Sequence, residues 1–137
     1  MSEDNVEIVL RVFDLCEQGR LDEVVDSYDA DATIMRDADT GPAQLTGQTF
    51  FQGRRSIREY FNDFFESYRD VSFEIERVQD HGDQVLVVYT LAAYGRLSGA
   101  PVQVRLAIRD RLRDDLIEEE IVYGDPAKAL EAAGLSE

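Results

Sequence analysis

The chain has 137 residues, of which 44% are hydrophobic and 31% charged. This length is typical of one domain and this composition of a folded protein, so we expect a single domain over residues 1–137. Its 29 acidic and 14 basic residues give a net charge of −15, which repels nucleic-acid phosphates and anionic lipid. The charge therefore argues against a nucleic-acid or membrane partner.

Cysteine and histidine are scarce, with one of each, Cys16 and His81. A single cysteine excludes an internal disulfide, and one histidine in a turn-like segment argues against a metal site. The acidic N-terminus lacks the apolar run of a secretory signal, and no stretch reaches the roughly 18 apolar residues of a membrane span. No glycine-rich phosphate loop follows a predicted strand. We expect a cytoplasmic protein without a metal or another cofactor.

Apolar residues in the first part of the chain recur every three or four positions and predict an amphipathic helix that ends at Gly19. They are Val6, Val9, Leu10, Phe13 and Cys16. A second short helix follows over residues 21–28, and residues 33–35 read as a short strand. Residues 37–53 predict a long loop, which in a small domain is often functional. Residues 56–68 predict a third helix with a broad aromatic face.

The second half of the chain alternates apolar and polar residues and predicts four strands, at residues 71–75, 85–94, 102–112 and 116–123. A short terminal helix begins at Pro126 and ends at Gly134. Helices followed by antiparallel hairpins predict an α+β fold with a curved sheet and helices on one face. We expect a cone-shaped mixed or antiparallel sheet that encloses an apolar pocket with the three helices of the N-terminal half.

Four segments carry a likeness to a known family: residues 16–24 (CEQGRLDEV), 28–34 (YDADATI), 57–61 (IREYF) and 129–135 (ALEAAGL). In this order they resemble the SnoaL-like polyketide cyclase and ketosteroid isomerase-like group of the nuclear transport factor 2-like superfamily, over nearly the whole chain. The resemblance implies the cone fold and a homodimer formed through the sheet face opposite the helices. It implies less about activity, because such folds host isomerases, cyclases, hydrolases and non-catalytic proteins.

The catalytic residues of these relatives are absent. Where ketosteroid isomerases carry a base aspartate, this chain has Arg36, and the place of their oxyanion-binding aspartic acid falls near Ile108. Epoxide hydrolase relatives use an Asp-Arg-Asp set, of which Ala92 and Tyr94 replace the first two members and only Asp125 remains. The resemblance therefore argues against a standard ketosteroid isomerase or a limonene-type epoxide hydrolase.

Two aspartates are the candidate catalytic residues. Strand alternation places Asp110 on the apolar face of residues 102–112, and Asp125 on the apolar face of the last strand together with Glu119. A carboxylate among apolar neighbours has a raised pKa, which suits acid–base work near neutral pH. Glu119 ranks lower because residues 118–120 read as an acidic strand edge. Alternatively, Arg36 enters the same cavity and holds Asp110 or Asp125 in a buried ion pair.

Aromatic side chains are expected to wall the pocket, and three tyrosines are candidates for ligand binding together with Arg36, because a tyrosine hydroxyl donates to a ligand carbonyl. They are Tyr28, Tyr60 and Tyr89. Cys16 reads as a packed helix residue rather than a nucleophile. His81 reads as an exposed turn residue.

The sequence thus predicts a small homodimer whose pocket binds a polyketide-, steroid- or other cyclic apolar molecule. If it is an enzyme, its chemistry is isomerisation, cyclisation or dehydration, with Asp110 or Asp125 as acid or base and a tyrosine or Arg36 stabilising negative charge. A non-catalytic ligand-binding or protein-interaction domain on the same fold stays open. Outer-face arginines are expected to meet acidic residues of a partner chain: Arg105, Arg109 and Arg111.

Overall fold

Four helices and six strands make up the part of the chain that the computed structural model describes, residues 4–36 and 49–134. The helices are α1 (Asn5–Glu17), α2 (Leu21–Asp26), α4 (Gly53–Ser67) and α5 (Pro126–Ala132). The strands are β1 (Tyr28–Arg36), β2 (Phe50–Gln52), β3 (Tyr68–Asp80), β4 (Gln84–Gly95), β5 (Pro101–Arg113) and β6 (Leu116–Tyr123). None of the described helices has the length and apolar character needed to cross a membrane.

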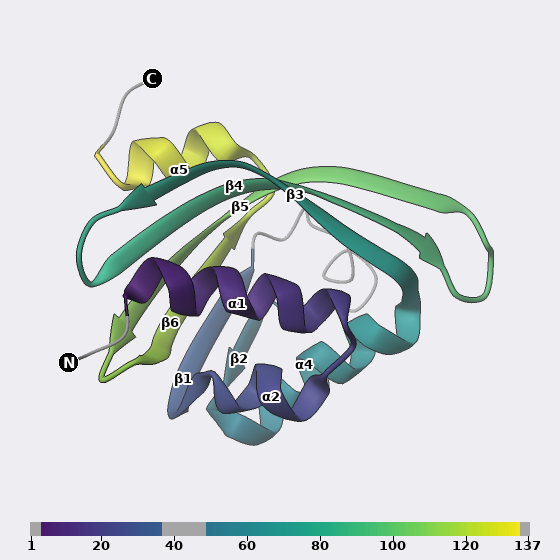
Figure 1. Cartoon of the computed structure of the whole chain (residues 1–137), viewed down its shortest axis with the longest axis horizontal. Coiled ribbons are helices and arrows are strands. Elements are labelled where there is room, and N and C mark those ends of the chain that lie inside the picture. Colours follow the sequence, from purple (N-terminus) through teal and green to yellow (C-terminus); the bar gives the residue numbers. More distant parts are fainter. Residues whose placement is uncertain (1–3, 37–48, 135–137) are drawn as a thin grey trace.

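The strands form one mixed sheet in the order β2-β1-β6-β5-β4-β3. β1 runs parallel to β6, and every other neighbouring pair is antiparallel. The sheet bends into an arch that does not close; α1, α2 and α4 lie in its hollow and α5 lies on its outer face (Figure 1). The predicted α+β class and curved sheet are confirmed.

The main differences from the sequence-based expectation lie in the first two strands. The sequence predicts a helix over residues 21–28 and a strand over residues 33–35, with residues 29–32 in neither, yet β1 runs through residues 29–32 with a shift of register between Tyr28 and Thr33. Such an irregularity disrupts strict alternation, so the acidic residues there resemble a turn in sequence. β2 lies inside the predicted loop, and residues 37–48 of that loop lie outside the described residues.

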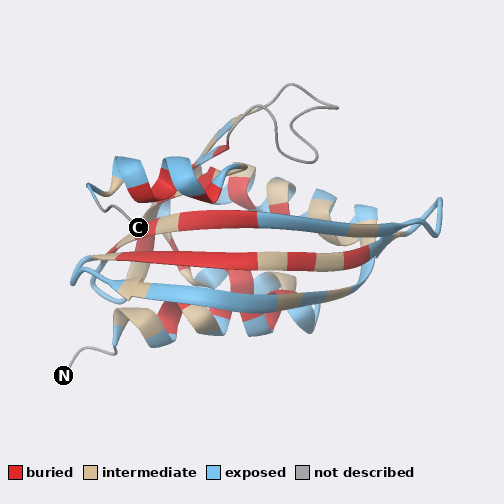
Figure 2. Cartoon of the chain, turned by 90° about the horizontal axis from the view of Figure 1, so that it is seen from above, coloured by how far each residue is buried: buried red, intermediate tan, exposed pale blue. Residues whose placement is uncertain are grey.

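The core lies between the inner face of the sheet and the helices. Asp4 caps α1 by accepting a hydrogen bond from the Val6 amide at 2.8 Å, which fixes where the helix begins. From there one face of α1 is buried against the sheet. Helix α4 likewise has a buried face, which contains Ile57 and Phe61. Buried residues follow the inner strands, whereas the edge strand β3 is largely exposed (Figure 2). Each fully buried aliphatic side chain contributes about 1.5–3 kcal/mol.

A second apolar cluster joins α5 to the outer face of the sheet. Ala129 and Leu130 of α5 pack on Leu86, Val88 and Ala107 of β4 and β5. This contact covers part of the face through which relatives are expected to form dimers.

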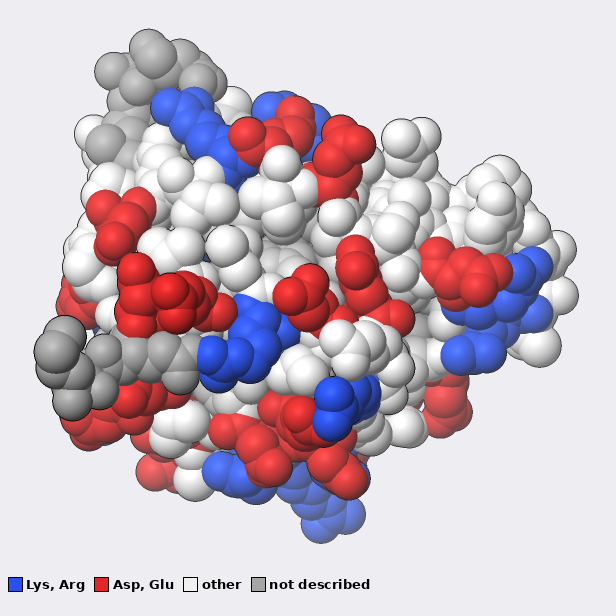
Figure 3. All heavy atoms as spheres, viewed as in Figure 1, with Lys and Arg blue, Asp and Glu red and all other residues white. Residues whose placement is uncertain are grey.

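The arginines of the outer face have acidic partners within the chain. Arg105 pairs with Glu76 at 2.7 Å, and Glu119 pairs with Arg109 at 2.6 Å and with Arg111 at 3.5 Å. On the side of the molecule shown in Figure 3, acidic side chains likewise lie beside the fewer basic ones. Formation of a homodimer stays a prediction.

Candidate functional site

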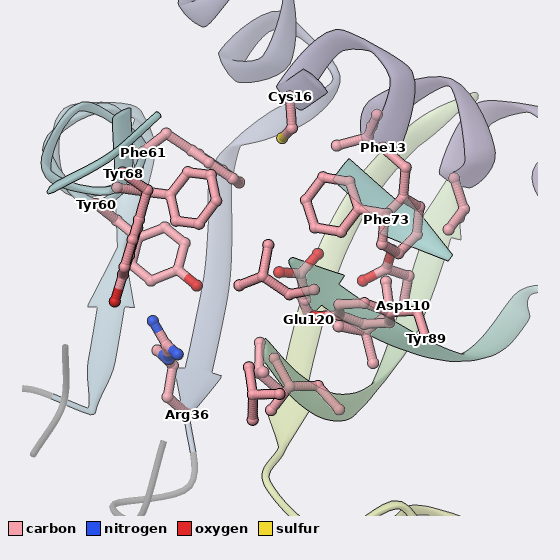
Figure 4. Close-up of a pocket in the computed structure, with 18 of the residues that line it drawn as sticks. Phe13, Cys16, Arg36, Tyr60, Phe61, Tyr68, Phe73, Tyr89, Asp110 and Glu120 are labelled. Atoms are coloured by element: carbon pink, nitrogen blue, oxygen red, sulfur yellow. The ribbon is translucent and has the colours of Figure 1, made fainter. Parts of the chain in front are cut away.

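A cavity of about 200 Å³ lies between the hollow face of the sheet and helices α1 and α4. Eight aromatic residues from five elements line most of it, and Figure 4 shows several of them around the carboxylates. These aromatic residues are Phe13, Tyr28, Tyr60, Phe61, Phe64, Tyr68, Phe73 and Tyr89. The lining of the cavity is thus largely apolar, and tyrosine hydroxyl groups interrupt it at separate points.

Two carboxyl groups lie beside each other in this apolar lining. Asp110 of β5 and Glu120 of β6 are direct cross-strand partners, and side chains so placed lie on one face with Cβ atoms about 5 Å apart. Both are buried, and the Tyr28 hydroxyl donates a hydrogen bond of 2.6 Å to Glu120 Oε1. A tyrosine and an aspartic acid therefore hold the glutamate from two neighbouring strands.

The surroundings of Asp110 favour its protonated form. Burial raises its pKa well above the ordinary aspartate value, and the charge of Glu120 and a hydrogen bond with it raise the pKa further, against a smaller lowering by Arg109. The pair resembles other paired carboxyls, in which one proton is shared because two like charges cannot both persist. The Oδ1 atom of Asp110 has no hydrogen-bond partner among the described residues.

Glu120 is the carboxyl that a bound molecule would touch. It is 6% exposed, against 1% for Asp110, and both residues line the cavity. In Figure 4 the Glu120 carboxyl projects into the middle of the cavity. The more exposed of the two carboxyls thus belongs to Glu120, a residue that the sequence analysis did not single out.

An irregularity in β6 explains why Glu120 was missed. Arg111 pairs with Glu119 but Leu112 pairs with Ile117, so Glu118 is an extra residue on β6. An extra residue in one strand shifts the side chains beyond it to the opposite faces. Strict alternation of side chains from Ile117 predicts that Glu119 faces the cavity. This prediction is wrong, because Glu119 pairs with Arg109 on the outer face.

Arg36, Tyr60 and Tyr89 also line the cavity, as the sequence suggested. The guanidinium carbon of Arg36 lies 5.2 Å from the centre of the Tyr60 ring, and the charges that shift the pKa of Asp110 are those of Glu120 and Arg109. Burial raises the pKa of Tyr60 to about 12 although Arg36 opposes this, and burial raises that of Tyr89 well above its ordinary value. Both hydroxyls therefore stay protonated and able to donate.

Asp125 is not at the site. It is exposed and forms the N-cap of α5, where its Oδ1 accepts a hydrogen bond of 3.0 Å from the Ala127 amide. The strand ends at Tyr123, so alternation no longer governs where the Asp125 side chain points. The expectation that it faces the pocket is wrong.

Replacing Asp125 with alanine should therefore affect stability and not the cavity. Loss of an N-cap side chain typically costs about 1 kcal/mol. We expect a fall of this size in the free energy of unfolding, measured by urea denaturation, and unchanged ligand affinity. An Asp125→Asn variant, which keeps a capping oxygen, should retain most of the stability. A loss of ligand binding in both variants would contradict this assignment.

Replacing Tyr28 with phenylalanine should be more costly, because it removes the hydroxyl that donates to Oε1 of buried Glu120. A buried group deprived of its hydrogen-bond partner costs about 1–3 kcal/mol. Urea denaturation should show a loss in this range, while Tyr94→Phe, at a residue 43% exposed, should unfold like the parent protein. Equal unfolding midpoints for the parent and Tyr28→Phe would show that the hydrogen bond contributes nothing.

The remaining chemically reactive side chains are unsuited to nucleophilic or metal chemistry here. Cys16 lines the cavity, but burial raises the pKa of its thiol far above the usual value, so it stays protonated. His81 is exposed beside Gln79 in the turn before β4. Within residues 4–36 and 49–134, no three His, Cys, Asp or Glu side chains come together as a metal site requires.

Comparison with known proteins gives one family and many solved structures. Residues 9–120 match the model of the SnoaL-like domain. A protein from Catenulispora acidiphila with a ketosteroid isomerase-like fold, solved with trimethylamine, is 18% identical with a TM-score of 0.72, over 95% of this chain and 94% of that one. No curated protein matches the chain.

Two further structures are similar over most of their length. SalBIII, described as an epoxide hydrolase/cyclase-like enzyme in pyran ring formation of salinomycin, is 22% identical with a TM-score of 0.72, over 87% of this chain and 88% of that one. A nuclear transport factor 2-like protein of unknown function from Burkholderia pseudomallei is 11% identical with a TM-score of 0.76, over 94% and 96%. Identities this low show the fold alone.

Proposed function

The chain belongs to the SnoaL-like domain family, and from this premise we propose that it is an enzyme that transfers protons within a small cyclic, apolar molecule. The observation that carries the proposal is the Asp110–Glu120 pair in the wall of an aromatic cavity. A carboxylate held beside a bound molecule in an apolar cavity is placed to act as a general base. Tyr28 and Asp110 hold this base in one orientation.

The groups around Glu120 suit an enolisation. In a cyclic ketone with a β,γ double bond, Glu120 removes a proton from the carbon between the carbonyl and the double bond. The electron pair of that C–H bond forms a double bond to the carbonyl carbon, and negative charge develops on the carbonyl oxygen. Glu120 then returns the proton to the γ carbon, which gives the conjugated ketone. No other reactant is consumed.

The developing oxyanion needs hydrogen-bond donors, and the cavity supplies them. The Tyr60 and Tyr89 hydroxyls stay protonated, and Arg36 lies beside Tyr60. Donors that are already oriented at a place of developing charge stabilise the transition state more than the substrate. The same base and donors serve ring closure or dehydration next to a carbonyl.

The similar structures support this proposal without deciding it. One of them is described as an epoxide hydrolase/cyclase-like enzyme, and another has a ketosteroid isomerase-like fold and holds a small organic molecule. We infer that this chain likewise uses its cavity for a small molecule. The chemistry itself is argued from the carboxyl pair and the donors of this chain.

The test is the isomerisation of 3-cyclohexen-1-one to the conjugated 2-cyclohexen-1-one, followed by the rise in ultraviolet absorbance. We expect the protein to accelerate this reaction well above the same concentration of free acetate. If it binds the ketone but gives no acceleration, the enzyme proposal is wrong. This protein would then be a non-catalytic ligand-binding domain.

A further inference from the structure

Three aromatic rings in the lining of the cavity contact one another. Phe13 of α1, Phe73 of β3 and Tyr89 of β4 contact one another with ring centres 4.9 to 5.7 Å apart and near-perpendicular planes. Edge-to-face contacts of this kind stabilise one another beyond the area that they bury. Because the rings come from three different elements, none can move aside without disturbing the others. We call these three residues the aromatic wall.

The two phenylalanines of the wall lie across the cavity from Arg36 and Tyr60. In the view of Figure 4, Arg36 and Tyr60 lie on one side, Phe13 and Phe73 on the other, and Glu120 between them. A ketone that places its oxygen at Tyr60 and its reacting carbon at Glu120 therefore turns the far edge of its ring toward the wall. Any second ring fused to that edge would meet the wall.

The size of the cavity agrees with this limit. It measures about 200 Å³. An apolar cavity of roughly 150 Å³ holds one benzene ring, so the space here suits one ring with its oxygen. Resting on the proposed function, we infer that the site selects single-ring ketones over fused-ring ketones, and that the aromatic wall sets this limit.

The first test uses the parent protein and two unreactive ketones, cyclohexanone and the fused two-ring 2-decalone. Without a size limit the larger ketone binds more tightly, because it buries more apolar surface. The wall predicts the opposite order, with cyclohexanone bound about tenfold or more tightly by calorimetry, since a methylene group that does not fit changes selectivity by roughly 10–200-fold. Equal or tighter binding of 2-decalone, or no binding of cyclohexanone, would overturn the inference.

The second test shortens the wall at Phe73. In Phe73→Ala we expect the affinity for 2-decalone to rise about tenfold and that for cyclohexanone to fall. The control is Phe65→Ala, because Phe65 packs on Phe64 and does not line the cavity. Phe73→Val, a smaller change, gives the same comparison if the alanine variant does not fold. An unchanged order of the two ketones in the Phe73 variants would contradict the role of the wall.

These binding measurements separate the inference from the proposed function. If 3-cyclohexen-1-one is not isomerised but Phe73→Ala reverses the order of the two ketones, the proposed enzyme function fails and the size limit holds. If the enone is isomerised but 2-decalone binds the parent protein as tightly as cyclohexanone, the function holds and the size limit fails.

Discussion

Replacing Glu120 with glutamine should lower the rate of 3-cyclohexen-1-one isomerisation by roughly 10²–10⁴-fold, the usual contribution of a positioned general base. The amide has the shape of the carboxylate and still accepts the hydrogen bond from Tyr28 through its carbonyl oxygen. It cannot take up the substrate proton. The loss should therefore appear in kcat, with little change in the affinity for cyclohexanone.

The matched control for this experiment is Glu119→Gln. Glu119 is the neighbouring residue, and it receives the same chemical change on the opposite face of β6, where it pairs with Arg109. We expect its isomerisation rate to stay within a small factor of the parent rate. If Glu119→Gln loses as much activity as Glu120→Gln, the assignment of Glu120 as base is contradicted.

For Asp110→Asn, the free energy of unfolding should rise relative to that of the parent protein as the pH rises. The pKa of Asp110 is raised in the folded state by burial and by Glu120, whereas the unfolded chain has the ordinary value near 3.9. Between these two values the folded state binds more protons than the unfolded state, so the parent loses stability with rising pH. The loss is about 1.4 kcal/mol for each unit by which the pKa is raised.

Asparagine at position 110 removes this dependence because its amide donates to Glu120 without titrating. The difference in free energy of unfolding between variant and parent, from urea denaturation at several pH values, should grow from acid pH until the raised pKa is passed. It should then level off. An exposed aspartate such as Asp63 provides the control variant, Asp63→Asn. A difference for Asp110→Asn that does not vary with pH would contradict the protonated state of Asp110.

The position of Asp110 followed from the sequence because β5 pairs with β4 without a break. Their register is continuous from Pro101 to Arg111, so side chains alternate as counted and Asp110 faces inward. Its catalytic role stays a prediction. Asp125 was misplaced for the converse reason, since it follows the strand and caps a helix.

Glu120 could not be predicted from the local pattern. Its inward direction depends on an extra residue in β6, and three successive glutamates give no signal of where that residue lies. Its partner Tyr28 is 92 positions away in the chain, and was read as the end of a helix rather than the start of β1. Only the parallel pairing of β1 with β6 brings the two residues together.

The most direct test of this account is the protonation state of Asp110, followed by the carboxyl ¹³C NMR resonance of labelled aspartate as the pH is varied. The resonance is assigned by its absence in Asp110→Asn. Burial against Glu120 predicts that this resonance titrates well above the ordinary aspartate value near 3.9. If it titrates instead near the ordinary value of about 4, the two carboxyls do not share a proton, and the proposed acid–base site is wrong.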